Sequence, residues 1–398
     1  MNNLKLIEFI FWLLFLITAV SYFGYGLVVY ILSGIKSFFV PNNKNKSLAE
    51  DNLPEVTLFV AAYNERDFIE SKVNNSLKLN YPESKIKHLW VTDGSDDGTP
   101  ELLNKYSGFT VLHVPERKGK VSAINRGMKQ VTTPIVIFSD CNSMLSVDSV
   151  RVIARLFTDP RVGCVSGEKR IQKKSQETAS GAGEGLYWNY ESIIKRSESK
   201  LYSAIGAVGE LFSVRTELYS EIPEDTILDD FIISMNIAMA GYRIQYSPDA
   251  MATETASVNI QEELVRKVRI SAGAFQSVSR LKGLLNPFRY GILSIEYFFH
   301  KFLRWIVAPF ALLLIIPLNI AIVINSGQEN SFYLYFLIIQ AVLYLFALTG
   351  WIFENYKVKY RFYFLPYYFF VMNLSAYLGL IRYIKGNQSV NWQKARRS

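Results

Sequence analysis

An acidic residue ends an apolar run in the first half of the chain. The run 134–139 (Pro-Ile-Val-Ile-Phe-Ser) predicts a buried strand, and Asp140-Cys141-Asn142 follows it directly. A carboxylate at the end of a buried strand packs poorly, but it can hold a divalent cation against a diphosphate. Asp140 and the Asn142 amide are therefore candidate ligands for Mg²⁺ or Mn²⁺. The alternative is an Asx turn that only ends the strand.

A second apolar run, 88–92, also ends in acidic residues. Asp93 and Asp97 can accept hydrogen bonds from a base or a ribose, although the same residues would also cap the next helix. Further along the chain, Lys118 and Lys120 flank a glycine that allows close approach, and their cations would lie near a diphosphate. A solvated basic loop is the alternative for the two lysines.

Two further charged pairs lie in the second half of the chain. Asp229 and Asp230 open a segment of helical apolar spacing, where the helix macrodipole alone would explain them. Adjacent carboxylates between apolar neighbours can also raise one pKa towards that of a working base. Arg266 and Arg269 share one helix face, so two guanidinium groups can clamp a diphosphate leaving group. Membrane-surface charge is the alternative for basic residues in this region.

These groups need a scaffold that brings them together. Short apolar runs at 56–62, 88–92, 110–114 and 135–139 alternate with segments of helical spacing, which predicts a doubly wound, mostly parallel α/β sheet. Ligands of such sheets bind at the carboxyl ends of the strands. The polar candidates that fall there are Tyr63, Asn64, Glu65, Asp93, Asp97 and Asp140.

Two glycine-rich stretches, 181–190 and 205–209, lie farther along the chain. The first also carries Tyr187, Trp188 and Tyr190. Aromatic rings beside flexible backbone suit a sugar or lipid acceptor, and core packing explains the tryptophan as well.

Half of the 398 residues are hydrophobic. The apolar run 7–32 can cross a bilayer core of about 30 Å. It lacks a small-residue cleavage site and a basic leading region, so we expect an anchor and not a removed signal peptide. The predicted organisation is an N-terminal transmembrane anchor (1–35), a cytoplasmic α/β domain (50–280), an interfacial amphipathic region (281–304), C-terminal transmembrane helices (305–384) and a basic tail (385–398).

The net charge is +8, but the basic residues form no single block of the kind that binds a nucleic acid polymer. They lie beside the apolar segments, as Lys36 and Lys357 do, which is typical of cytoplasmic loops that face anionic membrane lipid. The two cysteines, Cys141 and Cys164, fit a reducing cytoplasm. We therefore expect a multi-pass protein of the cell (plasma) membrane whose polar domain is cytoplasmic.

The sequence leaves open on which side of the membrane the C-terminal end lies. One leading membrane helix and three trailing ones (305–325, 332–353 and 362–381) would place the tail outside the cell. The tail is basic and carries no acidic side chain, which favours the inside. Either 362–381 is interfacial or re-entrant, or the charge rule fails here.

The order of the motifs resembles that of the membrane-embedded family-2 glycosyltransferases. This group includes hyaluronan, cellulose, chitin and poly-N-acetylglucosamine synthases and ceramide glucosyltransferase. The resemblance covers about residues 50–305 and rests on Ala62-Tyr63-Asn64-Glu65, Asp93-Gly94-Ser95-Asp96-Asp97-Gly98-Thr99, Lys118-Gly119-Lys120 with Ala123 and Asn125, Asp140-Cys141-Asn142, Asp229-Asp230 and Arg266-x-x-Arg269.

The resemblance implies a GT-A fold, a nucleotide-sugar donor that is usually a UDP-sugar, an Mg²⁺ or Mn²⁺ ion, and inversion at the anomeric carbon by direct displacement. Asp140 and Asn142 correspond to the metal-binding motif, Asp230 to the general base, and Arg269 to the arginine that stabilises the departing diphosphate. The residues expected at the nucleotide are Ala62, Tyr63, Asn64, Glu65, Asp93, Asp97, Lys118 and Lys120.

The chain departs from the family pattern in two places. Asn142 stands where the metal motif usually has a second acid, and Ile270 follows Arg269 where processive synthases have the tryptophan beneath the acceptor sugar. The missing tryptophan and a helix bundle that is small for a polysaccharide channel favour transfer of a single sugar to a lipid-linked or glycan acceptor. The alternatives are a processive synthase that extrudes its product and a non-catalytic subunit that binds a nucleotide-sugar.

Overall fold

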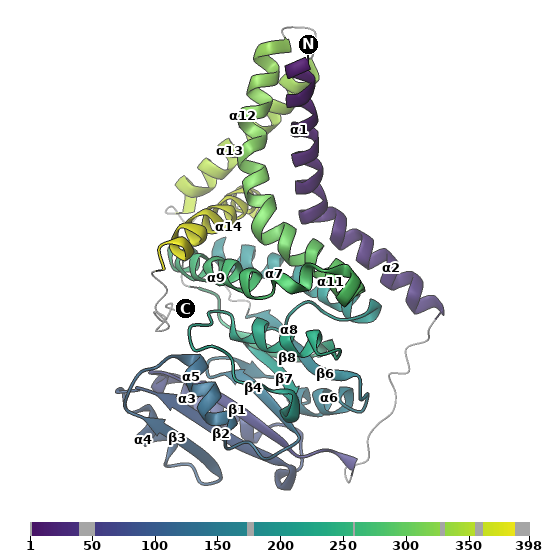
Figure 1. Cartoon of the computed structure of the whole chain (residues 1–398). Helices are drawn as coiled ribbons and strands as arrows, with labels where there is room; N and C mark the ends of the chain where they lie inside the picture. The colour runs from purple at the N-terminus through teal and green to yellow at the C-terminus, as the bar shows by residue number, and fades with distance from the viewer. Residues whose placement is uncertain are drawn as a thin grey trace.

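The computed structural model describes residues 2–39, 52–172, 179–257, 259–326, 331–354 and 361–386. Most of the predicted basic tail, 385–398, lies outside these residues. A sheet domain forms one end of the molecule, and long apolar helices form the other (Figure 1). A layer of helices lies between the two ends.

The sheet domain is built on one eight-stranded sheet with the order β3-β2-β1-β4-β7-β6-β8-β5. The strands β3, β2, β1 and β4 pair in parallel, as do β6 and β8. Antiparallel pairs join β7 to β4 and β6, and β5 to β8. The strands are β1 (Val56–Ala62), β2 (Ile86–Asp93), β3 (Phe109–Val114), β4 (Ile135–Asp140), β5 (Met144–Leu145), β6 (Val162–Ile171), β7 (Leu211–Arg215) and β8 (Arg243–Glu254).

The predicted fold class is confirmed, and the four strands expected from the apolar runs are the parallel half of the sheet. The helices of this domain are α3 (Arg66–Leu77), α4 (Thr99–Leu103), α5 (Lys120–Met128), α6 (Ser149–Leu156) and α8 (Asp229–Met239), with the short turns η3 (Glu83–Lys85) and η4 (Thr216–Leu218). Because β1, β2 and β4 are parallel, the residues that follow them reach the same edge of the sheet.

Antiparallel β7 brings one more segment to that edge. Leu211, the first residue of β7, pairs with Ser139 near the end of β4. The glycine-rich stretch 205–209 therefore arrives beside Asp140.

Apolar side chains fill both faces of the sheet, as the alternation along each strand requires. Phe59, Phe138 and Phe212 pack towards α5 and α8, whereas Leu58 and Trp90 face the opposite side with α3 and α6. These rings and aliphatic chains are almost completely buried. The two layers make the sheet a rigid support for the loops at its edge.

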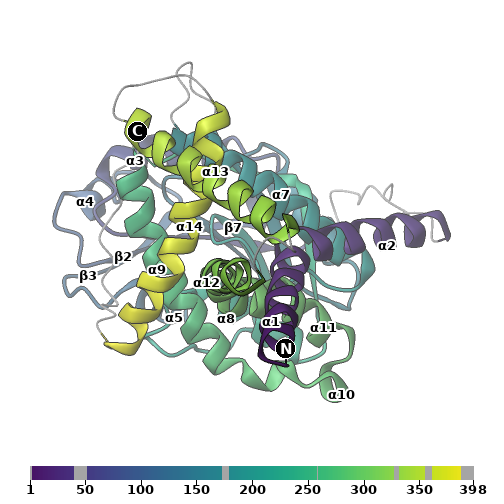
Figure 2. The same ribbon diagram turned by 90° about the horizontal axis from the view of Figure 1, so that it is seen from above.

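The layer above the sheet domain is made of helices that cross one another. It contains α7 (Ala179–Leu201), α9 (Ile260–Arg280), η5 (Lys282–Leu285), α10 (Pro287–Tyr290), α11 (Ile292–Tyr297), the π-helical η6 (Phe298–Val307) and α14 (Arg361–Ile384). Figure 2 shows α14 running beside α9. Small residues allow this contact: a Cβ atom on Gly379 would lie 2.5 Å from Cβ of Ser271, and the hydroxyls of Ser271 and Ser375 are 3.2 Å apart.

Three helical segments among the described residues are long and apolar enough to cross a membrane: 3–39, 292–326 and 331–353. The first comprises α1 (Asn2–Ala19), η1 (Val20–Gly24) and α2 (Tyr25–Phe39), and the other two contain α12 (Ala308–Ser326) and α13 (Ser331–Glu354). In Figure 1, α1 and α12 rise side by side, and α2 bends away along the helical layer.

The stretch 362–381 is not among those three segments. It lies within α14, whose Tyr367, Tyr368 and Val371 are buried, and α14 packs on α9 and α7. The domain boundaries themselves remain predictions.

Candidate active site

A cleft of about 600 Å³ opens at the carboxyl ends of β1 and β4, between the sheet domain and the helical layer. Its wall contains most of the residues expected from the sequence, namely Tyr63, Glu65, Lys120, Asp140, Asn142, Asp229, Asp230, Arg266 and Arg269. A small adjoining pocket shares Tyr63 and Lys120 with the cleft and adds Ala62 and Asp93. Acids that are far apart in the sequence thus gather around one hollow.

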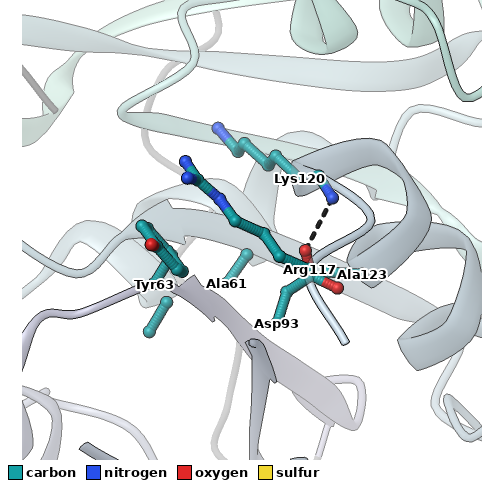
Figure 3. Close-up of a pocket in the computed structure, with 8 residues that line it drawn as sticks. Ala61, Tyr63, Asp93, Arg117, Lys120 and Ala123 are labelled. Atoms are coloured by element: carbon teal, nitrogen blue, oxygen red, sulfur yellow. Dashed lines mark hydrogen bonds between the residues drawn. The ribbon is translucent and has the colours of Figure 1, made fainter. Parts of the chain in front are cut away.

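The small pocket has an aromatic side and an acidic side (Figure 3). The Arg117 guanidinium lies 3.7 Å above the centre of the Tyr63 ring. Asp93 Oδ2 accepts hydrogen bonds from the backbone N–H groups of Lys118 (2.9 Å) and Gly119 (2.6 Å). Its buried Oδ1 accepts no hydrogen bond from the described residues, and the nearest cation, on Arg126, is 3.6 Å away. Backbone N–H groups thus fix one oxygen of this carboxylate, and the other has no hydrogen-bond donor among the described residues.

Three expected residues do not line either hollow. Asn64 holds the neighbouring loop through hydrogen bonds of 2.8 and 3.0 Å with Asp96. Asp97 accepts hydrogen bonds from the backbone of Arg66 and from Thr99 at the start of α4, which is the turn and capping role considered from the sequence. The Lys118 side chain is exposed and forms an ion pair with Glu116 at 3.2 Å.

Lys120, the other lysine of that motif, lies inside the cleft. Its ammonium is 2.9 Å from Asp140 Oδ1 and 3.4 Å from Asp229 Oδ2. Burial acts to lower the Lys120 pKa, but the two carboxylates outweigh it and keep the pKa above its ordinary value. A positive charge therefore already bridges the two acids.

Asp140 is also the candidate ligand for a metal ion. Among the described residues there is no group of three or more His, Cys, Asp or Glu side chains arranged to hold a metal ion. Asp140 lies on the cleft wall beside Asn142, and its side chain is 30% exposed. One accessible carboxylate with a nearby amide fits Mg²⁺ or Mn²⁺ when substrate phosphates and waters supply the other ligands.

Asp230 occupies the first turn of α8, where the glycine-rich stretch 205–209 presses against it. A Cβ atom on Gly209 would stand 3.1 Å from Asp230 Oδ2, and Gly206 adopts a φ of +82° while touching the Phe231 ring. Burial, Asp229 and Glu210 raise the pKa of Asp230 to about 7, against the opposing effect of Lys120. A carboxylate with such a pKa can act as a base near neutral pH.

The two expected arginines differ in their surroundings. Arg266 forms ion pairs with Glu184, with Glu263 (3.1 Å) and with Glu254 (3.7 Å), so its charge is matched within the protein. Lys169 joins the same buried cluster through Glu184 (3.4 Å) and Glu210 (2.6 Å). This network fixes α7 and α9 to the sheet. No sequence motif predicts it, because its members are dispersed along the chain.

Arg269 lies on the cleft wall in the field of Asp229 and Asp140. Its burial lowers its pKa, and these two acids oppose that effect. Arg269 is thus the better placed of the two arginines to meet a ligand that binds beside Asp140.

Aromatic side chains from the helical layer line the cleft. Tyr187 and Trp188 of α7 line it, as considered from the sequence. Trp305 of η6 lines it too, and its ring packs against Phe231, next to Asp230, with 5.1 Å between ring centres. The residue after Arg269 is not a tryptophan, yet the cleft has an indole from another element. Sequence spacing could not reveal Trp305, because it lies in a segment that reads as membrane-associated.

Comparison with known proteins identifies the family of the chain. The family model "Glycosyltransferase like family 2" matches residues 54–273. Poly-beta-1,6-N-acetyl-D-glucosamine synthase of Staphylococcus aureus is 30% identical over 249 residues, 60% of this chain and 59% of that protein. The Staphylococcus epidermidis enzyme of the same name is 27% identical over 269 residues, 64% of each chain. The chain therefore spans less than two thirds of the length of these relatives.

Among solved structures, the mannosyltransferase PcManGT from Pyrobaculum calidifontis, in complex with GDP-Man and Mn²⁺, has a similar fold. The TM-score is 0.69 at 22% identity, and the match covers 94% of this chain and 99% of that one. The predicted GT-A fold is thereby confirmed. Since the family model covers more than half of the chain, the protein belongs to glycosyltransferase family 2, and its described residues include helices suited to a membrane.

Proposed function

We propose that this family-2 member is a metal-dependent, inverting glycosyltransferase, and that it moves a sugar from a UDP-hexose or UDP-N-acetylhexosamine to a lipid-linked or glycan acceptor. The observation that carries the proposal is the shared cleft of Asp140, Arg269 and Asp230. These residues supply, in one hollow, a cation ligand, a cation for the leaving group and a base with a pKa near 7.

The small pocket suits the base of the nucleotide. Tyr63 and Arg117 line this pocket together, and a base would stack on the part of the ring that Arg117 leaves open. Asp93 Oδ1, which accepts no hydrogen bond from the described residues, would accept one from an N–H group such as that of uracil. The relatives named as N-acetylglucosamine polymer synthases favour an N-acetylhexosamine donor. The structural neighbour that holds GDP-Man supports only the fold, because its identity is 22%.

Asp140 and Asn142 would hold the Mg²⁺ or Mn²⁺ ion. When bound, the ion would neutralise charge on the diphosphate. The Lys120 ammonium lies on the same carboxylate, so it would turn from Asp140 towards the diphosphate as the donor binds.

Asp230 would act as the general base. Its carboxylate takes the proton of the acceptor hydroxyl while that oxygen forms a bond to the anomeric carbon. The bond from that carbon to the diphosphate oxygen breaks on the opposite face, and the departing charge is met by Arg269. Attack and departure on opposite faces invert the anomeric configuration.

The acceptor end of the cleft supports a sugar-bearing acceptor. Trp305 stands beside Phe231, close to the proposed base, and Trp188 lines the same cavity. Indole rings offer a flat apolar face to a sugar ring. Together with the polymer-synthase relatives, Trp305 keeps the processive synthase as a second candidate. Because Asp230, Asp140 and Arg269 all line one cleft, we favour a catalytic role over a non-catalytic one.

A cytoplasmic active site is part of the proposal. With the three candidate spans and an interfacial α14, the chain would start outside the cell and end inside it. The basic tail would then lie on the side that its charge favours.

Radiolabelled transfer from UDP-N-acetylglucosamine or UDP-glucose by the purified full chain tests the proposal. Asp230→Asn and Asp140→Ala should each reduce transfer by about 100-fold or more, as expected for loss of a base or of a charge-stabilising group. Asp249→Asn, at an exposed position of β8, is the matched control and should retain activity. Both cleft variants at wild-type activity would overturn the site, and product length separates single from processive transfer.

A further inference from the structure

A third arginine reaches the cleft from outside the matched family domain. Arg382 lies in the last turn of α14, more than 100 residues beyond the end of the family match at residue 273, and its side chain lines the same cavity as Arg269 and Asp229. The electrostatic effect of Arg382 on Arg269 is repulsive, so the two guanidinium groups lie near each other. Helix α14 therefore contributes a cationic side chain to the wall of the cleft.

The packing of α14 on α9 explains how Arg382 arrives there. Gly379 presses on the α9 backbone at Ser271 and Ala272, directly after Arg269 and Ile270. Residues three apart on a helix share a face, so Arg382 continues the face of Gly379 one turn further on, towards the cleft. A side chain at position 379 would push the two helices apart.

Among the described residues, no carboxylate balances the charge of Arg382 through an ion pair. Within the described parts of the chain, no ion pair or hydrogen bond of its guanidinium is found, whereas Arg266 is held by three carboxylates. A simpler explanation for an arginine in the last turn of α14 is its attraction to the negative C-terminal end of the helix dipole. That alternative does not require the side chain to line the cavity beside a second arginine, which is an unfavourable place for an unpaired cation.

We propose that Arg382 and Arg269 form an anion subsite on the α9–α14 wall of the cleft, which binds a phosphate group during transfer. The inference rests on the proposed function, because two sources of phosphate are then at hand: the diphosphate of the donor, or a phosphate on a lipid acceptor that enters from the membrane side. Two guanidinium groups from different helices suit the several oxygens of either group.

The test uses the purified full chain in neutral detergent with Mn²⁺. Binding of UDP and GDP is measured by calorimetry, with uridine and guanosine as phosphate-free partners, and binding of dodecyl phosphate is measured by tryptophan fluorescence. Arg382→Gln should raise the Kd of one class of phosphate ligand, either the nucleoside diphosphates or dodecyl phosphate, by about 10-fold or more. This is the effect expected for the loss of a charge-assisted hydrogen bond. Arg382→Lys should be intermediate, and nucleoside binding should be unchanged.

Lys385→Gln is the matched control, because it removes the same charge from the exposed end of the same segment. Gly379→Val should reproduce the Arg382→Gln result while keeping the arginine. A loss confined to the nucleoside diphosphate assigns the subsite to the donor, and a loss confined to dodecyl phosphate assigns it to the acceptor.

Wild-type binding of both phosphate ligands by Arg382→Gln would overturn the subsite but leave the proposed function intact. An equal loss of nucleoside binding would also overturn it, since the arginine would then be structural. A wild-type chain that binds no nucleotide would instead contradict the proposed function itself, and one that also fails to bind dodecyl phosphate would end both.

Discussion

Gly209 lies directly against Asp230: a Cβ atom on Gly209 would stand 3.1 Å from Oδ2 of that carboxylate. This contact holds the proposed base between the loop before β7 and the first turn of α8. The loop also donates a hydrogen bond to α8, since the backbone N–H of Ala207 donates to Ser234 Oγ at 2.9 Å. Gly209 therefore leaves the room that the Asp230 carboxylate occupies.

Gly209→Ala should lower kcat by about 10- to 100-fold, because a misplacement of the order of 1 Å at a reacting group has effects of this size. The measurement is steady-state sugar transfer together with thermal unfolding. Gly185→Ala is the control, since a Cβ atom there meets nothing within 4 Å. Wild-type kcat in Gly209→Ala would show that the contact does not position the base.

The pH dependence of transfer should follow Asp230. Its raised pKa of about 7 means that the basic, ionised form is lost as the pH falls below 7. The single-turnover rate should therefore rise through about pH 7 and level off above it. A rate profile that is flat between pH 5.5 and 8.5, or one that falls with rising pH, would contradict the assignment.

The same pKa predicts an effect on stability. The folded protein holds the proton of the Asp230 carboxyl more tightly than the unfolded chain does, where an Asp carboxyl has a pKa of about 4. Stability is therefore lost as the pH rises from about 4 to about 7, and the loss is complete above 7. Asp230→Asn should raise Tm relative to wild type at pH 8 and change it little at pH 4.5. Equal Tm differences at the two pH values would argue against a strained carboxylate.

Lys120 should compete with a metal ion for Asp140. Its ammonium, 2.9 Å from Asp140 and 3.4 Å from Asp229, neutralises the acids before the donor arrives. Lys120→Gln should bind Mn²⁺ more tightly than wild type without nucleotide, and yet transfer sugar more slowly, because the diphosphate loses a cation. Mn²⁺ titration by electron paramagnetic resonance measures the first effect. Lys118→Gln, at the exposed lysine of the motif, should match wild type in both assays.

Trp305 should affect the acceptor and not the donor. Trp305→Ala should raise the acceptor KM by up to about 10-fold, in keeping with an aromatic contact of about 0.5–1.5 kcal/mol. Trp305→Phe should recover most of the loss, and the donor KM should be unchanged in both. Trp351→Ala, at an exposed position of α13, is the control. A rise in donor KM alone would place Trp305 elsewhere in the reaction.

The sequence predicted well those candidate site residues that follow the ends of strands. Four apolar runs predicted β1 to β4, and parallel pairing of those strands brings Tyr63, Asp93 and Asp140 to one edge. Simple capping chemistry also predicted what Asp97 does. These inferences worked because they depend on neighbours in the chain.

The remaining features depend on contacts between distant segments. The antiparallel pairing of β7 places Gly209 beside Asp230, the proposed base. The crossing of helices places Trp305 and Arg382 on the wall of the cleft. Periodicity and composition carry no information about which of several helices will cross at a given point. The buried pairing of Arg266 was missed for the same reason, since its carboxylate partners include Glu184 of another helix.

The central claim is that Asp93, Asp140 and Asp230 surround one cation-bridged nucleotide diphosphate. The most direct measurement is a structure of the full chain with UDP and Mn²⁺, with the ion located by its anomalous scattering. The account predicts the ion against Asp140, the uracil against Tyr63 and Asp93, and Asp230 across the cleft from the diphosphate. An ion remote from Asp140, or a nucleotide bound outside this cleft, would contradict it.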